Sequence, residues 1–487
     1  MKKNKGFTLV EVLAVIIIIA VIGLITTPLI LNVIEDSRKN AFKESAFALM
    51  RVADLAYTKI RKEEVDFDDS RLDYEKKTFT GGTIYFVNGR ATLNNITNGR
   101  YCANGTRGDL IIKEGDCNVD LATAPILKRA TTAATSPFLD IGIAKNEIES
   151  IEFVNVSSFP AGATDVSQNG DGKVKLWKKD ENNDSKFEIY IGAVNDYVYA
   201  NPNSNYLFSN LLNIVKIDLE NFDTSTATNM VSMFNGAGGN QSSFELNLGR
   251  NFDTSKVKDM SYMFYYTGYK SQGFHLSLGE KFNTKNVENM NSMFYYFSSN
   301  TYDFKLDLGN KFDTSKVTNM HSMFYYAASE SNSVVLNLGN NFNSKNVTDM
   351  GSMFMGVGYA SINTRINLGN NFDTSNVTNM DNMFDGVGAK WSPSVTINLG
   401  KKFDTSKVET MAYMFHEAGS KSSTFELNLG ELFNVSSLLS GDSGTIHTFH
   451  NTGLVNPSFK PKAQVKTQTQ KNAILARFPN IEVTVKP

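Results

Sequence analysis

The chain has 487 residues, of which 20% are charged, and a formal net charge of −2. This length exceeds one ordinary core and predicts two or more domains. The near-neutral charge and the lack of a basic stripe argue against bulk attraction to nucleic acid, so no nucleic-acid partner is expected. Five histidines and two cysteines leave little material for a metal or thiol active site, and we expect no metal and no cofactor.

Residues 7–31 form an almost wholly apolar run that follows Lys2, Lys3 and Lys5. Twenty-five helical residues span roughly 37 Å, enough for a bilayer core of about 30 Å. Positive charge before the run predicts that this end stays cytoplasmic and that the bulk of the chain is exported. One acid, Glu11, lies near the start of the run, where an unpaired carboxylate is unfavourable.

This segment resembles the leader of type IV pilins and pseudopilins in its letters KGFTLVE, its aliphatic block and its Pro28. The resemblance implies cleavage after Gly6 by a prepilin peptidase and N-methylation of Phe7. It also implies assembly with other pilin-like subunits, in which Glu11 neutralises the new terminal ammonium of a neighbour. An ordinary membrane anchor with a stray glutamate is the alternative.

Beyond the leader (residues 1–6), we predict one long helix over 7–62 and a small head at 63–125. Apolar residues recur at helical steps at Phe42, Ala46, Leu49, Ala53, Ala56 and Ile60. Short alternating runs in the head predict antiparallel strands. Cys102 and Cys117 flank a loop and a strand there, and an exported chain favours a disulfide between them over two reduced thiols.

The middle of the chain contains few motifs. The small residues of 126–150 predict a linker, and the strand-like runs of 151–205 predict a β-rich lead-in to the repetitive second half of the chain. Asp180, Asn182 and Asp184 alternate as calcium ligands do, but Ser185 occupies the position where an EF-hand loop needs glycine. A solvated hairpin turn is the better interpretation.

From residue 206 to about 450 the chain repeats itself, with marker phenylalanines thirty residues apart and one step of thirty-one. They are Phe222, Phe252, Phe282, Phe312, Phe342, Phe372, Phe403 and Phe433. In each unit a run such as FELNLG predicts a half-buried strand, and a run such as DTSKVKDMSYMF predicts a short helix. Neither buries its apolar side alone, so the units must stack.

The units resemble the BspA-like leucine-rich-type repeats of bacterial surface proteins, whose hallmark is F-D-T-S-x-V-T-N-M-x-x-M-F. The resemblance implies a curved β/α solenoid of about eight repeats and a role in surface adhesion or recognition. The predicted class is α+β: a long helix with a small β head, then the solenoid, closed at 451–487 by a helix and a strand.

Three columns of the repeats are candidate sites. The fourteen methionines of M-x-x-M-F are expected in the core. The outward strand column, Glu245 to Glu426, varies from unit to unit and suits either a presented surface or simple solvent tolerance. Paired tyrosines follow M-F in three successive units and predict either a patch for a glycan or protein ligand or local packing. They are Tyr265, Tyr266, Tyr295, Tyr296, Tyr325 and Tyr326.

No catalytic constellation is evident, because His447 and His450 lack a glutamate partner and no nucleophile elbow is present. We therefore expect no enzyme, but a pilin-like subunit that is inserted in the cytoplasmic membrane and then presents its repeats at the cell surface. The alternatives are a pseudopilin of a secretion or DNA-uptake system, and a membrane-anchored receptor that never polymerises.

Overall fold

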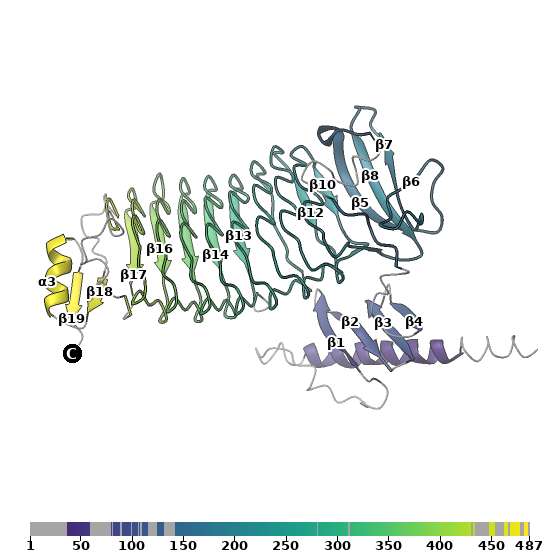
Figure 1. Cartoon of the computed structure of the whole chain (residues 1–487), viewed down its shortest axis with the longest axis horizontal. Coiled ribbons are helices and arrows are strands. Elements are labelled where there is room, and N and C mark those ends of the chain that lie inside the picture. The colour runs from purple at the N-terminus through teal and green to yellow at the C-terminus, as the bar shows by residue number, and fades with distance from the viewer. Residues whose placement is uncertain are drawn as a thin grey trace, which may run out of the picture. The chain divides into compact units, whose positions relative to one another are not determined.

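The computed structural model describes residues 37–58, most of 79–114, 124–130, 142–429 apart from 280, 310 and 311, and the segments 432–433, 448–452, 462–465, 468–477 and 482–485. Two compact units are present, Met1–Asp120 and Leu121–Pro487 (Figure 1). Strands dominate beside a few helical segments, in keeping with an α+β chain. Within the described residues, no helix has both the length and the apolarity to cross a membrane, and the predicted run at 7–31 lies outside them.

The first unit packs a helix on an antiparallel sheet. Residues 37–58 are helical. The sheet has the order β1 (Gly81–Val87), β2 (Arg90–Thr97), β3 (Tyr101–Gly105) and β4 (Ile111–Glu114). Phe42, Ala46, Leu49 and Ala53 of the predicted stripe are buried in the core that the helix shares with the sheet. The stripe and the antiparallel head are confirmed here, whereas residues 7–36 and 59–62 of the predicted helix are outside the described part.

Cys102 is fully buried in β3 and is disulfide-bonded. Its predicted partner, Cys117, is not among the described residues. In the same strand Tyr101 packs against Phe42 of the helix, with ring centroids 5.7 Å apart. The cysteine therefore lies in the core of the head, where a covalent constraint stabilises a unit too small to have a large apolar core.

The β-rich lead-in belongs to the repeat sheet. Its elements are η3 (Lys145–Glu147), β5 (Ile148–Val156), β6 (Thr164–Asp165), β7 (Val174–Lys179), β8 (Phe187–Val194) and β9 (Val198–Tyr199). The β7–β8 pair is an antiparallel hairpin with an exposed turn, in which the Asp180 carboxylate accepts the Asp184 N–H at 3.1 Å. This confirms the predicted hairpin. Because β5 pairs in parallel with β10 (Lys216–Asp218), the lead-in extends the sheet of the repeats at their first coil.

The predicted linker at 126–150 is wrong for its described residues. Ile126 and Leu127 are buried, and the Leu127 N–H donates to the Tyr199 carbonyl at 2.9 Å. Ile143 and Ile148 are buried in the same core. Small residues suggested a flexible segment, but the apolar side chains between them fill the lead-in.

Each thirty-residue repeat is one coil of a stack, and equivalent strands pair in parallel (Figure 1). The equivalent strands are β10, β12 (Glu245–Asn247), β13 (Asp303–Asp307), β14 (Ser333–Asn337), β15 (Asn363–Asn367), β16 (Ser394–Asn398) and β17 (Thr424–Asn428). A further short strand, β11 (Phe222–Asp223), pairs in parallel with β9 in a separate sheet. No strand is assigned at 274–278, where one was predicted. The packing continues through that coil, since Phe274 is buried against Phe244 with ring centroids 5.2 Å apart.

Two columns of phenylalanine rings run through the stack. In the column that follows the second methionine, Phe264, Phe294 and Phe324 stack at 5.4 and 5.3 Å between centroids. The marker phenylalanines form the second column, for example Phe282 and Phe312 at 6.1 Å. All fourteen repeat methionines are fully buried beside them, which confirms their placement in the core. Identical residues meet at every level because the coil period is constant.

The predicted short helices of the repeats are wrong: M-x-x-M-F segments form turns. The Met263 N–H donates to the Met260 carbonyl within its coil (3.2 Å), but the Tyr262 N–H donates to the Asn291 carbonyl of the next coil (3.0 Å). Tyr262 has a φ of 58°. A helix would direct every N–H to its own segment. Here alternate residues bond to the neighbouring coil, so the segment is a ribbon of turns.

The last described elements close the stack. They are β18 (Lys462–Val465), α3 (Gln468–Arg477) and β19 (Glu482–Val485). β18 pairs in parallel with β17 and β19, and Val483 is buried in the common core. These are the helix and strand predicted for the end of the chain, and they cover apolar side chains that the last coil would otherwise expose.

Candidate functional site

Most polar residues of the repeat motif hold the stack together. In F-D-T-S, the Asp253 carboxylate accepts the Ser255 N–H at 2.8 Å and fixes a turn. Thr254 is fully buried, and its hydroxyl donates to the Asn283 carbonyl of the next coil at 2.8 Å. The next coil repeats the bond from Thr284. These residues recur because each coil is fastened to its neighbour, so they are poor candidates for binding.

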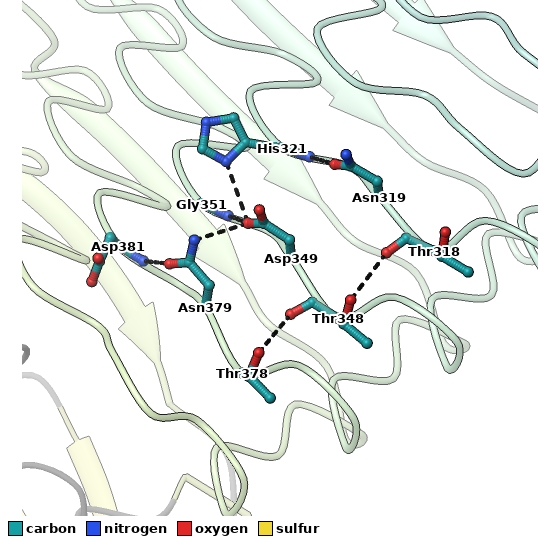
Figure 2. A network of polar contacts seen from close by, with 9 residues as sticks. All are labelled: Thr318, Asn319, His321, Thr348, Asp349, Gly351, Thr378, Asn379 and Asp381. Atoms are coloured by element: carbon teal, nitrogen blue, oxygen red, sulfur yellow. Dashed lines mark hydrogen bonds and ion pairs between the residues drawn. The ribbon is translucent and has the colours of Figure 1, made fainter.

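The T-N pair of the motif forms a second polar network along the stack (Figure 2). The Asp349 carboxylate accepts the Gly351 N–H at 2.9 Å and the Asn379 amide N–H at 3.0 Å, and it contacts the His321 ring at 3.3 Å. The hydrogen bond with Asp349 raises the pKa of His321. Although partial burial opposes it, hydrogen bonding with His321 and the Gly351 amide lowers the pKa of Asp349.

Within this network the Asp349 carboxylate already has three polar neighbours, Gly351, Asn379 and His321. Throughout the described part of the chain, no group of three or more His, Cys, Asp or Glu side chains could hold a metal ion. The Asp349 and Asn379 side chains each accept an N–H from two residues later in the chain, and these bonds stabilise turns.

The outward strand column has the predicted orientation without a recurring chemistry. Lys305, Val335 and Arg365 are in register on successive strands and exposed. The constant column beside it has a structural reason, because the Asn337 side chain accepts the Gly339 N–H at 3.3 Å where the chain leaves the strand. The varied column is free to change while its neighbour holds the turn.

The six predicted tyrosines come together as two rows, here called the tyrosine ladder. The first row is Tyr265, Tyr295 and Tyr325, and the second is Tyr266, Tyr296 and Tyr326. Ring centroids are 4.6 and 4.4 Å apart in the first row and 5.0 and 5.2 Å apart in the second. The backbone sets these intervals, since the Tyr266 N–H donates to the Tyr295 carbonyl at 2.8 Å. Coil spacing and aromatic stacking distance coincide.

The second row occupies an unusual backbone position. The φ angles of Tyr266, Tyr296 and Tyr326 are 56°, 50° and 51°, in the left-handed region. Three other coils have a glycine there, Gly236, Gly356 and Gly386, whereas Asn210 and Glu417 occupy it in outer coils. A bulky residue in this region costs about 1–3 kcal/mol, and such strain is often retained at functional sites. Left-handed non-glycine residues also occur elsewhere in the coils, as at Tyr262, so the distinguishing feature of the second row is three successive tyrosines at one such position.

All six side chains are half-buried. Burial, reinforced by neighbouring phenols, raises the pKa of Tyr296 and of Tyr326 to about 12. The hydroxyls therefore stay protonated and can donate hydrogen bonds at physiological pH. Within each row, the middle ring has a neighbour against both faces, so a ligand meets ring edges and hydroxyl groups.

Further tyrosines border the ladder. Tyr269 and Tyr359, which the sequence places near it, lie 5.0 Å from Tyr266 and 5.9 Å from Tyr326 between ring centroids. Tyr262 is a neighbour that sequence reasoning missed: its ring lies 5.8 Å from that of Tyr265, and it is 40% exposed. The sequence signal for it was its spacing of three residues from Tyr265, which brings two side chains together in a helix and in a ribbon of turns alike.

The processing and assembly residues predicted in the leader, Gly6, Phe7 and Glu11, lie outside the described residues. The structure therefore places neither the cleavage point nor the acid, and these remain predictions from the sequence. The tyrosine ladder is the candidate site that the described coils build.

Comparisons with known proteins give matches to the N-terminal segment and to the repeats. A family model described as a prokaryotic N-terminal methylation motif matches residues 1–27. A model described as "Mycoplasma protein of unknown function, DUF285" matches residues 203–337 and 329–443, the segment that contains the ladder. No curated protein and no solved structure matches the chain.

Proposed function

We propose that this chain, a surface-exposed pilin-type protein that joins a prepilin N-terminal methylation motif to DUF285 repeats, binds an extracellular ligand through its tyrosine ladder. The two matches confirm both resemblances drawn from the sequence. The methylation motif implies processing by a prepilin peptidase, assembly with pilin subunits, and passage from the membrane to the surface. Adhesion by a repeat solenoid, rather than catalysis, is the further step proposed here.

One observation carries this proposal: three successive coils have tyrosine at a left-handed position that is glycine in three other coils, at Gly236, Gly356 and Gly386, and Asn210 or Glu417 in outer coils. Packing alone does not require them, since coils with Gly236 or Gly386 there keep the same backbone. The ladder offers aligned hydroxyl donors and aromatic edges at intervals of 4.4–5.2 Å. A polymer with closely repeated acceptors, such as a glycan or an extended polypeptide, suits this array.

The test converts the ladder into the sequence of a neighbouring coil. Each tyrosine pair is replaced by the Asn-Gly found at Asn235 and Gly236, giving a sixfold variant of the full chain whose turns are already used by the fold. Binding to glycan and extracellular-matrix arrays should fall at least tenfold. A matched control replaces Lys305 and Arg365 by Ala in the outward strand column. Unchanged binding by the sixfold variant would refute the ladder as the site.

Assembly is tested separately by Glu11→Ala. A pilin-type subunit that uses this acid in the filament should lose incorporation into sheared surface fibres while remaining in the membrane. Normal incorporation would contradict the assembly role and favour the anchored receptor. A pseudopilin of a secretion or DNA-uptake system would instead show a defect in export or transformation with array binding unchanged.

A further inference from the structure

One coil of the stack contains an extra residue. The marker phenylalanines are thirty residues apart except at the step of thirty-one that ends at Phe403. Within that step, the Lys390 N–H donates to the Tyr359 carbonyl at 2.7 Å. The equivalent bond one coil earlier joins the Ala360 N–H to the Ser329 carbonyl at 2.6 Å, so the coils are still in register at Lys390.

The register resumes one residue later than in the preceding coil, and Trp391 is the residue between. Ser361 and Ser392 are both fully buried, and the Ser392 hydroxyl donates to the Ser361 carbonyl at 2.7 Å. Two residues further on, Asn363 of β15 pairs with Ser394 of β16. Trp391 is therefore a one-residue bulge whose backbone is held on both sides. A group that is fixed before it binds loses less freedom on binding, which favours affinity.

The bulge exposes a large aromatic side chain. Trp391 is 63% exposed, and Ile362 of the preceding coil is 52% exposed, whereas the stacked phenylalanines are buried. The Lys390 ammonium nitrogen lies 5.4 Å from the centroid of the indole ring, a cation–π contact. Because more than half of the Trp391 surface stays in solvent, the ring is open to a ligand. The extra residue adds an accessible aromatic surface rather than filling the core.

Two lysines lie on adjacent coils at this edge of the stack. The Ser420 hydroxyl donates to the Ala389 carbonyl across the two coils at 3.0 Å. Lys421 follows Ser420 and Lys390 follows Ala389, so the two lysines occupy equivalent positions. Both are exposed, whereas the acidic Glu330 occupies that position two coils before Lys390. This edge therefore becomes positively charged at the bulge, which favours an anionic ligand.

We propose that Trp391, Lys390 and Lys421 form a binding site for an anionic polysaccharide built from uronic acids. The indole ring stacks on the C–H face of one sugar ring, and the two ammonium groups pair with the carboxylates of that sugar and its neighbour. A uronic acid unit joins a broad apolar face and a negative charge in one rigid ring, so it matches an exposed aromatic ring beside two cations. An acidic polypeptide has its carboxylates on flexible side chains and lacks that face. This site is separate from the tyrosine ladder, and neither depends on the other.

The first experiment uses Trp391 as its own reporter. The chain has two tryptophans, so Trp177→Phe leaves Trp391 as the only indole in the full chain. Titration with polygalacturonate should change the Trp391 emission to saturation, and the affinity should fall as salt is added. Neutral dextran and poly-L-glutamate should bind at least tenfold more weakly. Equal affinity for dextran would overturn the role of charge, and equal affinity for poly-L-glutamate would assign the site to an acidic polypeptide instead.

Variants of the full chain, measured by titration calorimetry, locate the site. Deletion of Trp391 restores the thirty-residue coil and should weaken polygalacturonate binding at least tenfold, and Trp391→Ala should do the same without shortening the coil. Replacing Lys390 and Lys421 by Gln should also weaken binding at least tenfold, whereas the same change at Lys256 and Lys345, exposed in other coils, should not. The sixfold ladder variant should bind polygalacturonate as the unaltered chain does. Unchanged binding in both Trp391 variants, equal loss in the two lysine pairs, or loss in the ladder variant would refute the proposal.

Discussion

The alanine and glycine variants should differ in stability in opposite directions at two neighbouring ladder positions, Tyr296 and Tyr295. Tyr296 has a φ of 50°, whereas Tyr295 has no positive φ. At Tyr296, alanine keeps a Cβ in the left-handed region and should be about 1–2 kcal/mol less stable than glycine. At Tyr295, glycine should be about 0.5–1 kcal/mol less stable than alanine, because it adds freedom to the unfolded chain.

Each comparison removes the same ring from the same place, so the lost stacking nearly cancels between the alanine and glycine variants. The difference of the two differences is then roughly 1.5–3 kcal/mol and reports the backbone alone. Urea unfolding of the four full-chain variants measures it as shifts in the midpoint of the repeat transition. If glycine is the less stable replacement at both positions, Tyr296 does not have a strained left-handed backbone, and the argument from strain for the ladder is wrong.

Three other measurements test the packing and the polar networks. Thr284→Val removes a buried hydroxyl that donates to the next coil and should cost about 1–3 kcal/mol, whereas Thr318→Val at an exposed hydroxyl should change stability by less than about 0.5 kcal/mol. Phe294→Ala, in the stacked column, should cost about 3–5 kcal/mol in thermal or urea unfolding. Because Asp349 raises the pKa of His321, folding is favoured by protonation: this contribution is present below the ordinary pKa of 6.5 and lost as pH rises through the folded value. Solvent exposure limits it to under about 1 kcal/mol, and NMR titration should show that Asp349→Asn lowers the pKa of His321.

The repeat stack was predictable because the same core residues recur in the sequence of every coil. A constant period, an alternating strand and a repeated marker such as Phe282 define which side chains meet, and they do so without any knowledge of the turns. The amphipathic face of residues 37–58 was predictable for the same reason, since Phe42 and Ala46 recur at helical steps. Burial patterns can be predicted from the sequence because each buried position requires an apolar residue of suitable size.

The left-handed backbone positions of the turns were harder to predict from the sequence. Two methionines three apart suit a helix and a ribbon of turns equally well. The distinguishing signal was the G-x-G pattern in several coils, at Gly236 and Gly238 and again at Gly356 and Gly358. Glycine in a helix interior costs about 1 kcal/mol, so its recurrence there indicates left-handed positions.

Contacts between coils differ in how far the sequence could predict them. Tyrosines at one position of consecutive coils must become neighbours once the period is known, and the ladder follows from numbering alone. The meeting of Asn251 with Lys281 also follows from the period. The burial of Asn251 does not, because it depends on where the lead-in covers the first coils.

The hydrogen bonds that fasten the coils run from each repeat to the next one, so the repeat domain can lengthen in steps. A coil drawn out by tension would release thirty residues, roughly 100 Å of extended chain, and leave the following coils folded. The extension available to the repeat domain is then set by the number of its coils.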